Sequence, residues 1–179
     1  MDRTIPRVSL EEGHARRAPL ARGIGWGFIG GLVGTMVMDI LLMGTFLAVG
    51  RPALLCFSVV GDTAARVFAL TGAEIAGGVP AGVAAHYIIG PLVGLLFGAA
   101  AAAFPALRAD TLKKSIVLAV LYIEILSQPL LAMTPILLKM TAPVVALWYG
   151  GSFVMHLVLG LVLGSIVGYG LRPAPSRHW

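Results

Sequence analysis

Cysteine and charge are both scarce in this sequence. Its 179 residues include one cysteine, Cys56, and charged residues make up only 12%. A single cysteine excludes an internal disulfide and a cysteine-based metal cluster. The charged fraction is about half of that found in ordinary soluble domains. Apolar residues make up 58% of the chain, and there are 23 glycines. This balance predicts an integral membrane protein.

Four long apolar runs indicate an all-α fold. Each reaches the roughly 20 residues that a helix needs to cross a hydrocarbon core ~30 Å thick. The first run is too long, and too poor in cleavage signals, for a removable signal peptide. We therefore predict a four-helix transmembrane bundle within residues 23–172, with helices at about 24–49, 80–104, 115–138 and 146–171.

The basic residues predict the orientation of these helices. Of the 13 lysines and arginines, ten lie before the first run, between the second and third, or after the fourth, and three lie on the other side. By the positive-inside rule, both termini face the cytoplasm. The net charge of +5 is then explained by topology, and nucleic-acid binding is not expected, because basic residues are not interleaved with aromatic ones.

Three segments flank the apolar runs. Residues 1–22 read as a polar cytoplasmic tail in which Pro6 and Pro19 interrupt any long helix, and residues 173–179 read as a second tail. Residues 51–79 form the one long connection, and apolar residues recur in it at helical spacing. This spacing predicts a short amphipathic helix on the outer face of the bundle.

One pattern occurs twice, and both copies place a histidine before a row of glycines. His86 and His156 each begin an H-x3-G-x3-G-x3-G stretch, whose glycines are Gly90, Gly94 and Gly98 in the first copy and Gly160, Gly164 and Gly168 in the second. Steps of four residues stay on one side of a helix, so each row is a groove that admits another helix or a flat ligand.

Each histidine lies on the second helix of a pair whose first helix contains an acid. Asp39 precedes His86, and Glu124 precedes His156. We infer two repeated transmembrane hairpins related by a pseudo-two-fold axis along the membrane normal. Counting residues from the helix ends puts the two histidines and Asp39 in one layer, with Glu124 deeper.

These polar side chains lie at membrane depth. An ionised carboxylate such as Asp39 would cost on the order of 3 kcal/mol there, so it must be protonated, paired or bound to a cation. In the third run, Pro129 and Pro135 remove backbone donors and are expected to kink or open the helix near Glu124.

Four hypotheses account for this constellation. The side chains could simply hydrogen-bond across helices. They could hold zinc, iron or manganese through His86, His156, Asp39 and Glu124. The two histidines could be axial ligands of a haem, for which the glycine grooves make room. Finally, Asp39 and Glu124 could relay protons or ions.

Catalytic motifs are weak in this sequence. Ser127 has no histidine or acid at a spacing that would orient it as a nucleophile. The glycines recur every four residues within helices, without the strand-to-helix turn and lysine of a phosphate-binding loop. The sequence therefore favours a binding or accessory role over an enzyme.

The order of these features resembles that of a known family. The run from His86 to Pro105, the segment E-I-L-S-Q-P-L-L-A-M-T-P from Glu124 to Pro135, and Trp148-Tyr149 followed by His156 are similar to the YagU-like bacterial inner-membrane proteins and related uncharacterised four-helix families. The resemblance covers roughly residues 24–171. It implies a bacterial inner-membrane location and a four-helix architecture, and it implies no particular activity.

Two classes of function follow from the sequence. One is a binding protein whose bundle core holds a metal or haem through the paired histidines. The other is an accessory or scaffold subunit that packs through its glycine faces against a larger membrane complex or a second copy of itself. Membrane lipid is an expected partner in both.

Overall fold

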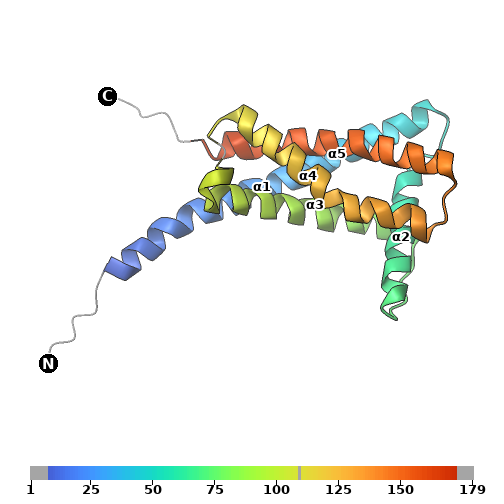
Figure 1. Cartoon of the computed structure of the whole chain (residues 1–179), viewed down its shortest axis with the longest axis horizontal. Coiled ribbons are helices and arrows are strands. Elements are labelled where there is room, and N and C mark those ends of the chain that lie inside the picture. Colours follow the sequence, from blue (N-terminus) through green and yellow to red (C-terminus); the bar gives the residue numbers. More distant parts are fainter. Residues whose placement is uncertain (1–7, 109, 173–179) are drawn as a thin grey trace.

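The computed structural model describes residues 8–108 and 110–172, and all the regular secondary structure within these ranges is helical. Five α-helices and one short 3-10 turn follow one another along the chain (Figure 1): α1 Val8–Ala48, α2 Leu55–Leu70, α3 Gly78–Ala103, the turn Pro105–Leu107, α4 Leu112–Leu137 and α5 Ala142–Gly170.

Four of these helices are long and apolar enough to cross a membrane. They are α3, α4, α5 and the Pro19–Ala48 part of α1. The outside of the bundle is apolar as well, since Ile88, Ile125 and Leu147 are 65%, 71% and 77% exposed. A surface of this kind suits lipid rather than water. The expected all-helical class and the four apolar spans are thus confirmed.

The first helix begins earlier than its sequence suggests. It starts at Val8, and Pro19 lies inside it, whereas helix was expected only from about residue 24. A proline removes one backbone hydrogen bond and bends a helix, but residues on both sides can keep helical geometry. Residues 1–7 of the expected N-terminal tail (residues 1–22) and the expected tail at residues 173–179 lie outside the described residues.

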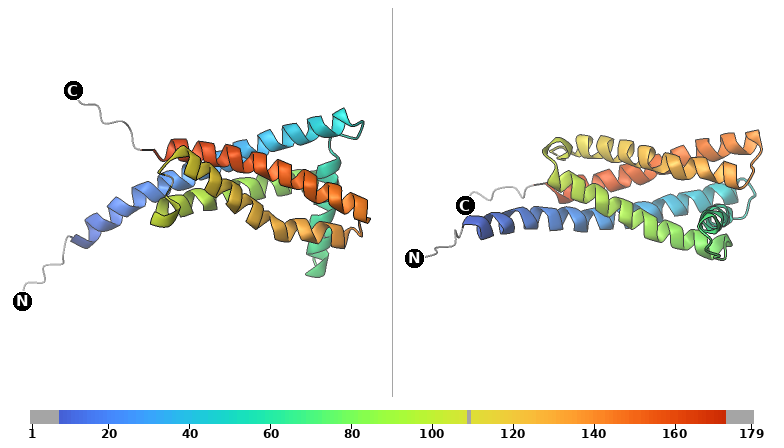
Figure 2. Two further views of the ribbon diagram at one scale, coloured as in Figure 1. Left: turned by 45° about the horizontal axis from the view of Figure 1, so that its top comes forward. Right: turned by 60° about the horizontal axis from the view of Figure 1, so that its bottom comes forward.

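The helices form two layers. The layer of α1 and α3 packs on the layer of α4 and α5, mainly through contacts between α1 and α5. Figure 2 shows these layers from two sides, with α2 lying across one end of the bundle. There α2 packs chiefly on α3 and less extensively on α4.

Glycine allows α1 and α3 to touch backbone to backbone. A Cβ atom added to Gly94 would lie 2.6 Å from the Cα of Gly31, and one added to Gly98 would lie 2.8 Å from the Cα of Gly27. Real side chains do not fit at these distances. The first glycine row is therefore filled by the preceding helix of the same chain.

The second glycine row is filled in the same way, by α4. Added Cβ atoms on Gly160 and Gly164 would lie 2.7 Å from the Cα of Val120 and 2.6 Å from the Cα of Ile116. Gly168 faces Ser115 of α4. The Ser115 hydroxyl donates a hydrogen bond to the carbonyl of Gly164 at 2.7 Å. Small residues thus bring α4 and α5 together.

Both expected prolines lie within α4, and the helix is continuous through them. Pro135 lacks the N–H that would bond to the carbonyl of Leu131 one turn earlier. In its place, the indole N–H of Trp148 on α5 donates to that carbonyl at 3.1 Å. A neighbouring side chain therefore satisfies the freed backbone group, as membrane helices require.

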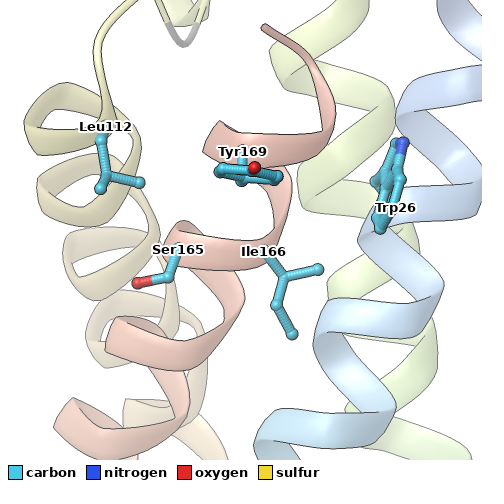
Figure 3. Close-up of a pocket in the computed structure, with 5 residues that line it drawn as sticks. All are labelled: Trp26, Leu112, Ser165, Ile166 and Tyr169. Atoms are coloured by element: carbon cyan, nitrogen blue, oxygen red, sulfur yellow. The ribbon is translucent and has the colours of Figure 1, made fainter.

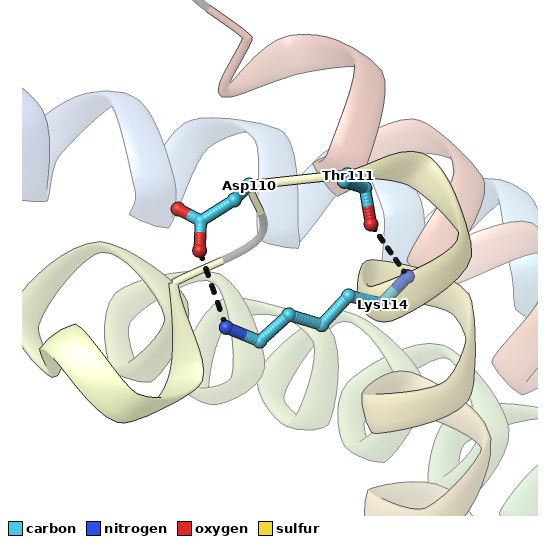
Figure 4. Close-up of polar contacts among 3 residues, drawn as sticks. All are labelled: Asp110, Thr111 and Lys114. Carbon is cyan, nitrogen blue, oxygen red and sulfur yellow. Dashed lines mark hydrogen bonds and ion pairs between the residues drawn. The ribbon is translucent and has the colours of Figure 1, made fainter.

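The connection between α3 and α4 ends in a capped turn. The Thr111 hydroxyl accepts a hydrogen bond from the backbone N–H of Lys114 at 3.2 Å, and the Lys114 ammonium lies 3.3 Å from the Asp110 carboxylate (Figure 4). Thr111 is therefore the N-cap of α4, and it fixes where this helix begins.

Candidate functional site

Asp39, the most buried charged residue among those that the structure describes, is bonded to the first histidine. Asp39 is 2% exposed, and its Oδ1 lies 2.8 Å from Nδ1 of His86. The glycine packing sets this contact: Gly31 packs on Gly90 and Gly94, and Thr35, one turn further along α1, lies against Gly90. A further turn in each helix brings Asp39 opposite His86.

The hydrogen bond lowers the energy of either protonation state of the pair. If the proton lies on the imidazole, the pair is an ion pair, and if it lies on the carboxyl group, both partners are neutral. A buried carboxylate without a partner would be strongly unfavourable at this depth. One proton between Asp39 and His86 removes that penalty.

Helix α2 covers this pair. The ring of Phe57, which is 3% exposed, lies 5.1 Å from the His86 ring, centroid to centroid. The helix is held there by Gly61, because a Cβ on that residue would lie 2.8 Å from the backbone N of Gly82 on α3. An apolar ring thus closes this end of the site.

Cys56, the single cysteine, is also near the pair. Burial, and to a lesser degree the negative charge of Asp39, raise the pKa of the Cys56 thiol from 9.0 to about 12. The thiol therefore stays protonated and behaves as a small apolar group. Sequence reasoning assigned neither Cys56 nor Phe57 to the site, although the helical spacing of residues 51–79 predicted the helix that contains them.

The second histidine reaches the same layer through α5. Gly30 of α1 packs on Leu163, and Gly34 packs on Leu159. One turn further in each helix, Met38 comes level with Met155, which puts Asp39 and His156 within about 3 Å of each other along the bundle axis. The Nδ1 atom of His156 is buried without a hydrogen-bond partner among the described residues.

Glu124 lies opposite His156 but does not bond to it. In the packing of α4 on α5, Ile116 faces Gly164 and Val120 faces Gly160, so the next turn brings Glu124 level with His156. Both carboxylate oxygens of Glu124 are buried, and neither has a partner in the described part of the chain.

The four polar residues predicted from the sequence are thus only partly brought together. Asp39 and His86 are in contact, whereas His156 and Glu124 share their level without a direct hydrogen bond. The remaining unpartnered buried atoms of this layer, within residues 8–108 and 110–172, are Oδ2 of Asp39 and Oγ1 of Thr35. Sequence reasoning did not single out Thr35, although it lies one turn before Asp39.

The fit to a cofactor can be tested on these residues. Within the described ranges, no three His, Cys, Asp or Glu side chains are grouped closely enough to hold a metal ion. The glycine rows, which were expected to make room for a haem, are filled by α1 and α4. The arrangement is instead suited to holding a proton and to hydrogen-bonding water at several unpartnered atoms.

Comparison with known proteins gave no relative: no family model matches this chain, and no curated protein or solved structure is significantly similar to it.

Proposed function

We propose that this chain is a bacterial inner-membrane protein that binds and relays protons through its polar layer. One observation carries the proposal: Asp39, inside a membrane-spanning helix, shares a 2.8 Å hydrogen bond with His86. Intramembrane pairs of acid and histidine are the side chains from which proton relays are built.

The chemistry of the pair allows a proton to move without forming an isolated buried charge. A proton can pass along the bond between Nδ1 of His86 and Oδ1 of Asp39, and each end of the transfer leaves a paired group. Nδ1 of His156 and the carboxylate oxygens of Glu124 are buried polar atoms without partners among the described residues, and the packing of α4 on α5 puts the two residues at the same level. A water molecule between them would extend the path from the Asp39–His86 pair to Glu124.

Packing on two sides of the Asp39–His86 pair leads us to propose gated transfer rather than an open pore. Phe57 on α2 covers the side of His86, and the backbone contact of Gly31 with Gly94 closes the other side. Transfer then requires a displacement of α2 or a rotation of a side chain. The expected turnover is slow compared with a channel.

Proton flux into liposomes tests the proposal. The full chain would be reconstituted with a pH-sensitive dye inside, and a potassium gradient with valinomycin would supply the driving force. Wild type should acidify or alkalinise the lumen faster than protein-free liposomes, and Asp39→Asn should reduce the rate to that background. Asp110→Asn is the matched control, because Asp110 is exposed at the turn before α4 and should leave the rate unchanged.

Two results would overturn the relay. One is wild-type flux equal to that of protein-free liposomes under driving forces of either sign. The other is an Asp39→Asn variant that is inserted and folded and still conducts at the wild-type rate.

A metal site is the second candidate, because Asp39, His86 and His156 share one layer and two of their ligand atoms are unpartnered. A shift of α5 could bring these ligands to one ion. Elemental analysis of the detergent-purified protein decides between the candidates. A stoichiometric metal that is lost in a His86→Ala, His156→Ala double variant would favour metal binding, whereas no metal in either sample leaves the relay.

The accessory-subunit hypothesis has less support from the geometry. It depended on glycine faces that are open to a partner, and those faces are filled by helices of the same chain.

We also propose that the two hairpins are repeats and that both termini are cytoplasmic. The likeness of the two histidine-glycine stretches supports the repeat, because each packs on the preceding membrane-spanning helix. A reporter fused to the C-terminus that is active only in the cytoplasm would test the orientation.

A further inference from the structure

A groove lies at the opposite end of the bundle from the Asp39–His86 pair. It has a volume of about 340 Å³ and is lined by Trp26, Leu112, Ser165, Ile166 and Tyr169. Figure 3 shows it on the face of α5, with Leu112 of α4 on one side and Trp26 of α1 on the other. The volume is at the lower end of the ~300–1,000 Å³ that is typical of small-ligand sites.

The groove is apolar and lies at the start of α4 and the end of α5, beside the first part of the Pro19–Ala48 span of α1. Leu112 is the first residue of α4, and Tyr169 is the last but one of α5. Its polar atom on α5, the Ser165 hydroxyl, donates to the carbonyl of Leu161 at 2.7 Å. Tryptophan and tyrosine at helix ends are typical of the membrane interface. The groove therefore suits a hydrocarbon chain that enters from that interface.

Basic residues lie close in sequence to the residues that line the groove. Arg22 lies one turn before Trp26, Arg172 follows Tyr169, and Lys113 follows Leu112. The Arg22 guanidinium donates to the carbonyl of Arg172 at 3.3 Å, so the two arginine positions are adjacent. Among the described side chains, no carboxylate pairs with Arg22, Lys113 or Arg172. The nearby Asp110 pairs with Lys114.

From this juxtaposition we infer a binding site for an anionic phospholipid. One acyl chain lies in the groove between Trp26 and Leu112, and the phosphate group lies against Arg22 and Arg172. Arginine binds phosphate oxygens in pairs, and basic residues at the membrane surface attract anionic headgroups. The lipid would then tie α1, α4 and α5 together at this end.

Quenching by brominated lipids tests this site. The replacements Trp148→Phe and Trp179→Phe leave Trp26 as the only fluorescent reporter in the groove. At equal mole fraction, chain-brominated phosphatidylglycerol should quench Trp26 more strongly than chain-brominated phosphatidylcholine. Each basic residue is expected to contribute about fivefold to the relative binding constant. Arg22→Gln with Arg172→Gln should bring that constant close to that of the zwitterionic lipid.

Three controls separate a site from general attraction. A protein with Trp148 as the only tryptophan should show no preference, because Trp148 lies on the other end of α5. Ser165→Phe fills the groove, keeps every charge and should also remove the preference. Glycerol phosphate in solution should not compete, since it has no chain for the groove. Equal quenching by the two lipids, or a preference that survives in Ser165→Phe, would overturn the proposal, and competition by glycerol phosphate would show an anion site without a lipid chain.

Discussion

Adding one methyl group between α1 and α3 should destabilise the bundle, whereas the same change two residues away should not. Gly27 and Gly25 are both glycines in the membrane-spanning part of α1. A Cβ on Gly27 would lie 3.0 Å from the Cα of Gly98 and would also press on the carbonyl of Gly94. A Cβ on Gly25 would meet nothing within 4 Å.

The distances give the size of the effect. Carbon atoms in contact prefer a separation of about 3.5–4.0 Å. Helices α1 and α3 must therefore move apart by roughly 0.5–1 Å to accept the methyl group of Gly27→Ala. This displacement forfeits a quarter to a half of the dispersion energy between the two helices. Overpacking of this kind destabilises proteins by about 1–3 kcal/mol. Gly25→Ala should be neutral or stabilise the protein by up to about 1 kcal/mol, because alanine favours helix.

The free energy of unfolding can be compared by titration with dodecyl sulfate, followed through tryptophan fluorescence and far-ultraviolet circular dichroism. Gly27→Ala should unfold at a lower detergent fraction than wild type, and Gly25→Ala at the same or a higher one. Equal midpoints for the two variants would refute the packing of α1 on α3 through glycine, and with it the register that places Asp39 opposite His86.

Three further predictions follow from the described contacts. Burial and Asp39 raise the thiol pKa of Cys56 from 9.0 to about 12, so alkylation of Cys56 near pH 8 should be about a thousandfold slower than that of an ordinary cysteine. The alkylation rate should rise about tenfold per pH unit and should be faster in Asp39→Asn. A plateau of the rate near pH 9 would contradict this. Ser115→Ala removes a buried hydrogen bond to a carbonyl of α5 and should lower the free energy of unfolding by about 1 kcal/mol in the same detergent titration. Trp148→Phe leaves the Leu131 carbonyl without its donor, so the C-terminal part of α4 should exchange its amide hydrogens faster, and unchanged exchange there would mean that water supplies the bond.

The sequence predicted which polar residues form the site but not which of them are in contact. The sequence singled out Asp39, His86, His156 and Glu124 because charged and ionisable residues are rare in apolar runs. Counting residues along the helices grouped three of them in one layer. It did not show which of the four are in contact, because contact depends on helix rotation and register, which no single helix determines.

The roles of the glycine rows and of Pro135 became clear only from the residues that pack against them. The glycine rows predicted that another group packs closely against them. Only the packing of α1 on α3 and of α4 on α5 showed that this group is a helix of the same chain. Pro135 was expected to kink or open its helix, and the structure shows which neighbour satisfies the carbonyl that it frees, namely the Trp148 side chain. The helices that fill the glycine rows, and Trp148, are not near in sequence to the positions that they contact.

The sequence by itself determined the all-helical class, the four apolar spans and the identity of the buried polar residues, because length and hydropathy are local properties that a lipid environment constrains strongly. Only the tertiary structure decided that Asp39 pairs with His86, that Phe57 of α2 covers this pair, and that α1 continues through Pro19. These features depend on how neighbouring helices fill one another's grooves, and packing of that kind is a property of the whole bundle.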